Sequence, residues 1–289
     1  MGGVAVGLDW VPAGVKGNGA VLLGRGFTVD GHWSRPFRVV THAHSDHLLH
    51  IRRSVRECMF IVANPYTFRF MNVLGYSVPE EKRLALDYGV SVDLDGETVT
   101  LFRSRHIPGS SVVVVEGRGY RVGYTGDFKV PGTDVVEGLD VLVLDATYGS
   151  VRLQRRWGEA EALASLVEII ERYISRGPVW VYGYNGKLQE VMVELRIRGV
   201  DYPFLADYRT LKLAEIASEF YGVDLGEVRP YAGGPVDESV VVFTHMTRRR
   251  SLARLPGIHV VLTGWELRSP AAWAGDNVIR VSFSDHATF

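Results

Sequence analysis

The hydrophobic pattern divides the chain into two parts. Between residues 19 and 148, apolar positions form short β-branched and aromatic runs that glycines separate, which is typical of strands. The clearest of these runs are Phe37–Val40, Thr98–Phe102, Ser111–Glu116 and Tyr120–Tyr124. We therefore expect the first half of the chain to be mostly β-structure.

From Gly158 the apolar positions take helical spacing, and Gly177-Pro178 predicts the end of this first helix. Strand and helix patterns then alternate, which predicts a parallel sheet covered on both faces in a separate α/β unit, residues 151–275. The predicted strands are Val179–Tyr182, Phe204–Leu205, Val240–Thr244 and Ile258–Thr263, followed by a last β-type run at Asn277–Phe283. The predicted helices after the first are Gly186–Arg198 and Tyr208–Tyr221.

Composition indicates an ordinary globular protein without membrane segments. With 289 residues and 46% hydrophobic content, the chain can bury the core of two domains or of one domain with an insertion. Its apolar runs are strand-sized, and Met1–Trp10 lacks the basic flank of a signal peptide. The single cysteine, Cys58, excludes an internal disulfide framework and a Cys-based zinc cluster. We expect a cytoplasmic protein, with no membrane partner, whose metal ligands would be His and carboxylates.

The net charge of -1 excludes a uniformly basic surface. Binding of nucleic acid would therefore depend on local clusters of positive charge. The candidates are Arg248–Arg250 with Arg254, and Arg152 with Arg155 and Arg156. Such runs could neutralise phosphates, but a run of charge is more often simply a solvated face.

A dense group of metal-type side chains lies directly after the predicted strand Phe37–Val40. On an extended segment His42 and His44 project to the same side, whereas Asp46 and His47, past a turn, can face a second point nearby. This spacing suits two metal ions better than a His-rich surface loop. The remaining histidines outside recognisable motifs are expected to be structural: His32, His50, His245 and His259.

The segment His42–His47 resembles the HxHxDH signature of the metallo-β-lactamase superfamily. His106, after the strand ending at Phe102, matches the third His of that pattern, and Asp127, after the strand ending at Tyr124, matches its metal-bridging aspartate. The resemblance implies an α/β fold, a metallo-β-lactamase αββα sandwich.

Two further segments resemble motifs of the β-CASP nucleases within this superfamily, which include Artemis-like DNA nucleases and small prokaryotic proteins such as ligase-associated exonucleases and mRNA 3′-end processing factors. Leu144–Gly149 is similar to the first β-CASP motif, and Ser282–His286 is similar to the second. The α/β unit stands where that family inserts its cassette. We therefore expect a metallo-β-lactamase domain at residues 1–150 and 276–289, and a β-CASP-like cassette at residues 151–275.

The resemblance implies a two-zinc hydrolase. One Zn²⁺ would be bound by His42, His44 and His106, and a second by Asp46 and His47, with Asp127 bridging the two. His286 would protonate the leaving oxygen or stabilise charge on the phosphate, and Asp145 would orient His286. Independently of any family, two metal ions can clamp both the attacking and the leaving oxygen of a phosphodiester.

Two residues are candidate contacts to substrate. Ser110, with Gly109, could shape a phosphate pocket. Lys187 stands after two glycines at a predicted helix start, where backbone amides could hold a phosphate beside it. A solvated lysine is an equal alternative for this residue. The spacing of a P-loop is absent, which excludes an ATPase of that type.

The sequence ends at Phe289, before the third motif that the family usually carries. Two expectations remain open: the chain is a fragment, or its second zinc site lacks a protein ligand and binds metal weakly. A naturally short chain would expose an apolar sheet edge at this truncated C-terminal side, which would invite a second copy or another partner.

The expected function is a zinc-dependent nuclease acting on DNA or RNA. Asp145 stands where RNA-processing members more often have Glu, which favours DNA and an Artemis-like exonuclease or endonuclease role in DNA repair. RNA processing by the same site is the first alternative. The others are hydrolysis of a small ester or thioester, which Asp145 and His286 disfavour, and metal-free nucleic-acid binding, which the intact ligand set disfavours.

Overall fold

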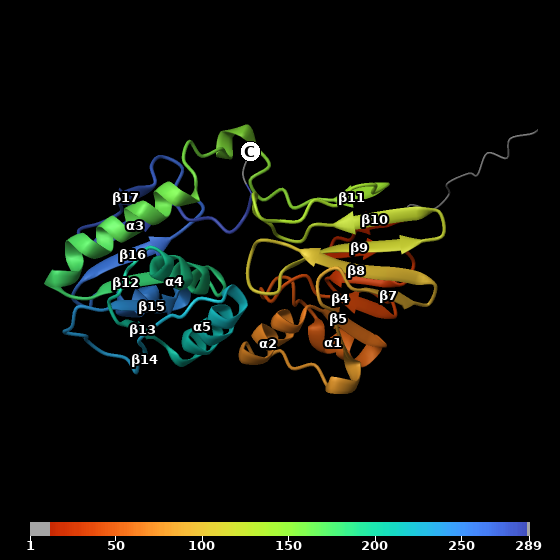
Figure 1. Cartoon of the computed structure of the whole chain (residues 1–289), viewed down its shortest axis with the longest axis horizontal. Helices are drawn as coiled ribbons and strands as arrows, with labels where there is room; N and C mark the ends of the chain where they lie inside the picture. The colour runs from red at the N-terminus through yellow and green to blue at the C-terminus, as the bar shows by residue number, and fades with distance from the viewer. Residues whose placement is uncertain (1–11, 288–289) are drawn as a thin grey trace, which may run out of the picture.

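The protein, described here from a computed structural model over residues 12–287, contains three sheets in two lobes (Figure 1). Two sheets pack face to face in one lobe, and the third sheet with its helices forms the other. The segment Met1–Trp10, which we considered for a signal peptide, lies outside the described residues. Over the described range, no helix is long and apolar enough to cross a membrane.

The sandwich consists of a six-stranded and a five-stranded sheet, with the orders β1-β2-β3-β4-β5-β6 and β11-β10-β9-β8-β7. The first sheet comprises β1 (Ala13–Val15), β2 (Ala20–Leu23), β3 (Phe27–Asp30), β4 (Phe37–Val39), β5 (Phe60–Ala63) and β6 (Arg83–Ala85). The second comprises β7 (Ser91–Leu94), β8 (Glu97–Arg103), β9 (Ser111–Gly117), β10 (Tyr120–Tyr124) and β11 (Val141–Val143). Between the sheets lies a core of fully buried side chains that includes Val29, Val39, Leu101 and Val113.

Helices α1 (Ile51–Glu57) and α2 (Pro65–Val73) cover the outer face of the first sheet, where Ile61 and Phe70 belong to one buried cluster. Asn64 caps α2, because its Oδ1 accepts the N–H of Tyr66 at 3.0 Å. A single 3₁₀ turn, Glu80–Lys82, precedes β6. The mixed α/β sandwich expected from the sequence is therefore confirmed.

The second lobe, which we call the cassette, is built on a seven-stranded sheet with the order β14-β13-β15-β12-β16-β18-β17. All its strand pairs are parallel except β17 with β18. Its strands are β12 (Val179–Gly183), β13 (Phe204–Ala206), β14 (Val228–Pro230), β15 (Val241–His245), β16 (Ile258–Leu262), β17 (Ala271–Trp273) and β18 (Val278–Val281). The alternation of strands and helices predicted from the sequence is confirmed.

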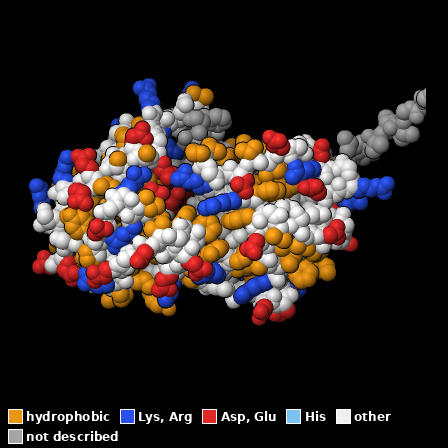
Figure 2. Space-filling view, in the orientation of Figure 1, with side chains coloured by type: hydrophobic (Ala, Val, Ile, Leu, Met, Phe, Trp, Pro, Cys, Tyr) orange, Lys and Arg blue, Asp and Glu red, His pale blue; other side chains and the backbone are white. Residues whose placement is uncertain are grey.

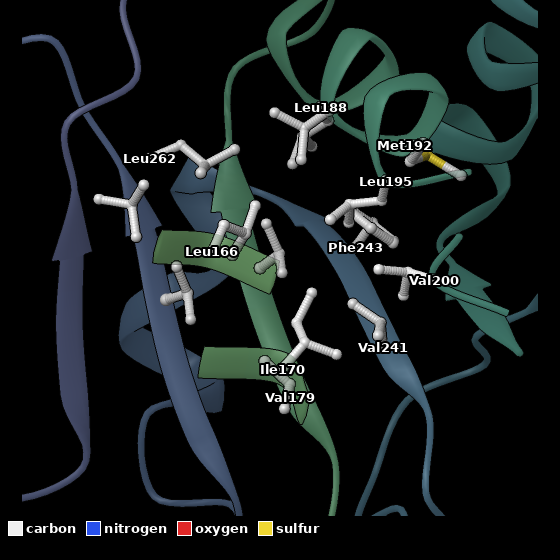
Figure 3. Packing of buried hydrophobic residues seen from close by; sticks show 14 of the residues in the cluster. Leu166, Ile170, Val179, Leu188, Met192, Leu195, Val200, Val241, Phe243 and Leu262 are labelled. Carbon is white, nitrogen blue, oxygen red and sulfur yellow. The ribbon is translucent and has the colours of Figure 1, made fainter. Parts of the chain in front are cut away.

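Helices cover the cassette sheet unequally. On one face α3 (Glu159–Tyr173), α4 (Lys187–Ile197) and α5 (Tyr208–Tyr221) bury the larger core, shown in Figure 3. The opposite face is covered by the short helix α6 (Arg249–Leu252) and by Tyr231. Short 3₁₀ turns complete the lobe at Val151–Leu153, Ile174–Arg176 and Met246–Arg248.

The boundary that we expected at residue 276 is wrong, because β18 belongs to the cassette sheet and not to the sandwich. It pairs in parallel with β16, and its side chains Ile279 and Val281 are buried in the cassette core. The chain returns to the sandwich only after Val281, where the N–H of Ala287 donates to the carbonyl of Phe128. With this change, the division into a sandwich domain and a cassette remains our proposal.

The C-terminal strand is not an open edge, because β17 pairs with the side of β18 that faces away from β16. The edges of the second sandwich sheet are β11 and β7, and Leu142 in β11 and Leu144 just after it are about half exposed. On the face drawn in Figure 2, acidic and basic side chains are interspersed rather than segregated. That distribution agrees with the net charge of -1.

Candidate metal centre

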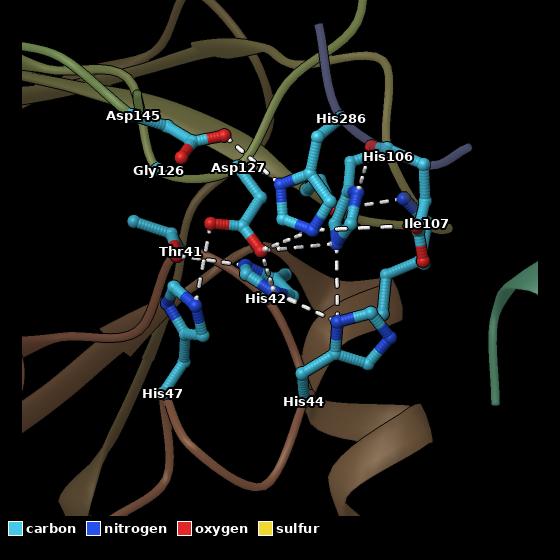
Figure 4. Close-up of polar contacts among 12 residues, drawn as sticks. Thr41, His42, His44, His47, His106, Ile107, Gly126, Asp127, Asp145 and His286 are labelled. Atoms are coloured by element: carbon cyan, nitrogen blue, oxygen red, sulfur yellow. Dashed lines mark hydrogen bonds and ion pairs between the residues drawn. The ribbon is translucent and has the colours of Figure 1, made fainter. Parts of the chain in front are cut away.

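Five segments that are distant in sequence converge between the lobes (Figure 4). The segment His42–His47 follows β4, and His106 follows β8. Asp127 follows β10, and Asp145 follows the neighbouring parallel strand β11. Strands β8 and β10 both run antiparallel to β9, so their loops reach the same edge of the sheet. His286 arrives from the cassette side, after β18.

Four donor atoms surround one point, which we call the first metal position. His44 Nδ1 lies 3.2 Å from His42 Nε2 and 3.1 Å from His106 Nε2. Asp127 Oδ2 lies 3.5 Å from both His42 Nε2 and His106 Nε2. A tetrahedral zinc ion with bonds of about 2.0–2.1 Å holds its ligands about 3.3–3.4 Å apart. The spacing of the four donors therefore fits such an ion.

The orientation of two of these imidazoles is fixed by their other ring nitrogen. His44 Nε2 donates to the carbonyl of Asn185 at 2.8 Å, and His106 Nδ1 donates to the carbonyl of Asp285 at 2.7 Å. Burial, followed by the neighbouring imidazole of His44, lowers the pKa of His106 well below its ordinary value. The lone pairs of His44 Nδ1 and His106 Nε2 consequently point into the first metal position, as metal-binding histidines require.

Asp30 holds two other histidines, and sequence reasoning missed it. Its buried carboxylate accepts the hydroxyl of Thr41 at 2.8 Å and faces His47 Nδ1 at 2.7 Å. The Thr41 hydroxyl oxygen in turn accepts His42 Nδ1 at 3.0 Å. Asp30 ends β3 with a φ of 58° before Gly31, so its Asp-Gly pair indicates only a turn from the sequence. No sequence motif around Asp30 indicates that it orients His42 and His47.

The side chains that we expected at a second metal position lie around the other oxygen of Asp127. His47 Nε2 is 3.4 Å from Asp127 Oδ1 and 3.6 Å from Asp46 Oδ2. The Asp46 side chain is 75% exposed, so this position is more open than the first. Burial acts to lower the pKa of His47, but the carboxylates of Asp30 and Asp127 outweigh it and raise this pKa well above its usual value. A metal bound here would have to displace that proton.

His286 and Asp145 form a hydrogen-bonded pair beside the first metal position. His286 Nδ1 is 2.9 Å from Asp145 Oδ2, and His286 Nε2 is 3.8 Å from Asp127 Oδ2. Burial acts to lower the pKa of His286, but the bond to Asp145 and the charge of Asp127 raise it above its ordinary value. Asp145 is held in turn by the N–H and hydroxyl of Thr147. This arrangement provides a fixed, readily protonated imidazole.

The metal positions open into a cleft of about 710 Å³ between the sandwich and the cassette. The sandwich side of the cleft includes His44, Asp46 and Asp127. On the cassette side, Tyr184 and Trp265 are among the lining residues, with Arg209 and His245.

Ser110 does not contact the cleft, contrary to our expectation of a phosphate pocket. It is 1% exposed, and its hydroxyl accepts the N–H of Ile107 at 3.0 Å. Its own N–H donates to the carbonyl of Ile107, and its carbonyl accepts from Tyr88 and Ser104. Ser110 is therefore a buried residue that closes the turn after His106, and it does not line the cleft.

Lys187 is not a solvated lysine: it lines the cleft but is largely buried and paired with a carboxylate, and a contact to phosphate stays our proposal. Its side chain is 5% exposed, and its Nζ lies 3.1 Å from Asp285 Oδ1. Burial would raise the pKa of Asp285, but Lys187 and then His106 hold this pKa far below its usual range. Lys187 thus stabilises the carboxylate of the residue whose carbonyl accepts His106. The sequence signal for this partner was the motif Ser282–His286, in which Asp285 precedes the active-site imidazole.

The expectation for the remaining histidines is met in part. His32 contacts Ser54 at 2.9 Å, and His259 contacts the hydroxyl of Tyr182 at 2.8 Å, both inside the fold. His50 is exposed at the start of α1, where its side chain makes no capping bond. His245, however, lines the cleft. It follows the buried strand residues of β15 and is carried to the cleft by the strand's carboxyl end.

Comparison with known proteins shows the family of the chain. Residues 38–174 match the family model described as a beta-lactamase superfamily domain. A protein of Acidianus ambivalens, described as an uncharacterized protein in the lig 3′ region, is 37% identical over 140 residues, which are 47% of this chain and 99% of that relative. RNase aCSPSF2 of Saccharolobus solfataricus is 26% identical over 63% of this chain and 42% of its own length.

Similarity at lower identity extends to protein artemis and to a solved structure. Protein artemis of Rattus norvegicus is 24% identical over 55% of this chain. The chain thus spans less than half the length of the RNase and only 28% of artemis. A protein of unknown function from Enterococcus faecalis has the same fold, with a TM-score of 0.60 at 14% identity, over 89% of this chain and 72% of that protein.

Proposed function

We propose that this chain hydrolyses phosphodiester bonds of nucleic acid with bound zinc. The chain belongs to the metallo-β-lactamase superfamily and to its β-CASP branch, and it is a hydrolase of that superfamily. One observation carries the proposal: the Asp145–His286 pair lies beside the metal cluster, with His286 Nε2 3.8 Å from Asp127 Oδ2. A proton donor next to a metal position suits the departure of an alkoxide from a phosphodiester.

The first metal would be held by His42, His44, His106 and Asp127, and the second by Asp46, His47 and the other oxygen of Asp127. The donor set of imidazole nitrogens and carboxylate oxygens fits zinc. When bound, such ions lower the pKa of water and offset the negative charge of a phosphate.

The chain's own residues supply the proton. Asp145 fixes His286 through Nδ1 at 2.9 Å, which leaves Nε2 toward Asp127 Oδ2 at 3.8 Å in a cleft that His286 and Asp127 both line. Against burial, which lowers the pKa of His286, the bond to Asp145 and the charge of Asp127 raise this pKa, which favours the charged imidazole that would donate a proton to the leaving oxygen. Asp145 is the positioning residue of this pair.

DNA is the substrate that we propose first. Asp145 stands where RNA-processing members of the resembled family more often have Glu, and a DNA-repair nuclease is the function that this difference favours. RNA is the second candidate, since one relative is an RNase at 26% identity. A small ester or thioester is disfavoured by the Asp145–His286 pair, which resembles the β-CASP motifs that hydrolases of small molecules in the superfamily lack.

The test uses metal-analysed protein with end-labelled single-stranded DNA, duplex DNA and RNA, alongside Asp127→Ala and His44→Ala. We expect cleavage by the wild type and its loss in both variants. Product length over time separates exonuclease from endonuclease. If both variants cut as fast as the wild type, the assigned site is wrong. If no polymer is cut while a small ester is hydrolysed, the nuclease proposal fails.

A further inference from the structure

Two large aromatic side chains stand exposed on the cassette side of the cleft. Tyr184 is 53% exposed and Trp265 is 64% exposed, although both line the same cleft as His44 and His286. Tyr184 follows β12 and Trp265 follows β16, which are parallel neighbours in the cassette sheet. The two residues therefore leave adjacent strands at the same edge of the sheet, and this edge borders the metal centre.

Trp265 is fixed against the wall of the active site. Its ring centroid lies 5.1 Å from that of Tyr148, and Tyr148 lies 6.1 Å from the ring of His286. The backbone N–H of Trp265 donates to the hydroxyl of Thr263 at 3.1 Å. At Gly264 a side chain would be impossible without a shift, because a Cβ there would lie 2.0 Å from the Tyr148 hydroxyl. The indole is thus held from one side and open to the cleft.

Tyr184 also packs against a neighbouring ring, and the residue after it contacts His44. Its ring meets the edge of His245 at a centroid distance of 5.5 Å. The next residue, Asn185, accepts His44 Nε2 through its carbonyl at 2.8 Å. Tyr184 is consequently the neighbour in sequence of the residue that orients His44, a candidate ligand of the first metal position. The guanidinium-bearing residue Arg209 lines the same cleft and adds positive charge there.

Large rings left in water at an active site are best explained by a flat ligand that covers them. We propose that Tyr184 and Trp265 are stacking platforms for unpaired bases of a single-stranded nucleic acid, a proposal that rests on the nuclease function above. Bases within a duplex already stack on both faces, so open aromatic rings select strands whose bases are free. Arg209 would neutralise a backbone phosphate of the same strand.

The test separates stacking from phosphate contacts by removing bases from the ligand. Binding of fluorescein-labelled oligothymidylate to the metal-loaded protein is measured by anisotropy, against a strand of equal length with abasic sites and against a duplex. The proteins are the wild type, Trp265→Ala, Tyr184→Ala and the ring-preserving Trp265→Phe. Trp273→Ala is the matched control, because Trp273 is 56% exposed but lines a groove beside α3. Cleavage of the same strands is followed in parallel, with single-stranded RNA as a further arm.

Each alanine variant is expected to bind the base-bearing strand about 5- to 150-fold more weakly, the range for loss of one stacked base. The same variants should bind the abasic strand like the wild type, and Trp265→Phe should restore most of the loss. Equal losses on both strands, or a wild type that prefers duplex, would overturn the stacking proposal. A wild type that binds single strands in this pattern but cuts none would overturn the nuclease function and leave the stacking site standing.

Discussion

The two candidate metal positions differ in how firmly the protein holds the side chains around them. At the first, four donor atoms from His42, His44, His106 and Asp127 all lie within 4.8 Å of one another, and three of these residues are buried. At the second, within the described residues, Asp127 and His47 are joined by Asp46, whose side chain is 75% exposed. Binding at the first position requires little reorganisation, so we expect tighter binding there.

The cassette supplies residues that orient two of the ligands at the first position. Asn185 orients His44, and Lys187 fixes Asp285, whose carbonyl orients His106. His47, in contrast, is oriented from within the sandwich, by Asp30. The cassette therefore braces the first metal position, whereas the sandwich alone braces His47.

Nearby contacts extend this brace to the loops that carry the ligands. Gly186 packs so closely on Ile107 that a Cβ would lie 2.0 Å from the isoleucine side chain. The buried Glu190 pairs with Lys129, two residues after Asp127. The amino-terminal turn of α4 thus contacts the loops on both sides of the first metal position.

The largest effect is expected from losing a ligand of the first position. In His44→Ala the tight ion should be lost, and cleavage should fall by on the order of 10³-fold or more, because the charge that stabilises the transition state goes with it. Metal content by mass spectrometry and single-turnover rates would measure both. His50→Ala is the control, since His50 is exposed in the same segment. Retention of the tight ion in His44→Ala would contradict the assignment of the tighter binding to the first position.

The next largest effect is expected for the proton donor. His286→Asn should lower the cleavage rate by about 10²–10⁴-fold, the range for general-acid catalysis, while the affinity of the first position for metal stays near that of the wild type. A substrate with a good leaving group, such as a p-nitrophenyl phosphodiester, needs no proton and should show a much smaller loss. Equal losses on both substrates would place His286 among the metal ligands instead.

Removing the Lys187–Asp285 contact should weaken metal binding at the first position and leave it unchanged at the second. Lys187→Met leaves Asp285 buried without its cation, and we expect about 10- to 100-fold weaker metal binding at the first position, the usual cost of disturbing a contact behind a ligand. Lys212→Met is the control, because Lys212 pairs with Glu215 on the exposed side of α5. Titration of the metal-free proteins with zinc would show the change, and an equal loss at both positions would refute a selective brace.

The smallest expected effect is a shift of the pH profile. His286 acts in its protonated form, so its contribution is present below its pKa and is lost as pH rises through it. The bond to Asp145 is the main influence that raises this pKa against burial. Asp145→Asn should therefore move the alkaline limb of the rate profile to lower pH. A limb that stays in place in this variant would mean that another group titrates there.

Much of this centre could be predicted from the sequence, because its ligands lie in one short segment and at strand ends. The positions of His42–His47, His106 and Asp127 follow from strand patterns that the structure contains. Their supports could not be predicted in this way. Asp30 reads as a turn residue, and Lys187 at a helix start reads as a phosphate contact, because burial and partners depend on how the lobes pack together.

The predicted end of the cassette at residue 275 was wrong for a related reason. The run Asn277–Phe283 predicts a strand, and β18 is one. Pattern alone, however, does not tell which of two sheets a strand will join. The burial of Ile279 and Val281 against the cassette core decides it here.

The unequal metal positions are tested most directly by measuring two zinc dissociation constants, through competition with a chromophoric chelator, in the wild type, His44→Ala and Asp46→Asn. We expect two ions per chain with affinities at least about tenfold apart, since one position must reorganise an exposed side chain and displace a proton from His47. The tighter ion should be lost in His44→Ala and the weaker one in Asp46→Asn. Equal affinities, or loss of the tighter ion in Asp46→Asn, would contradict the account.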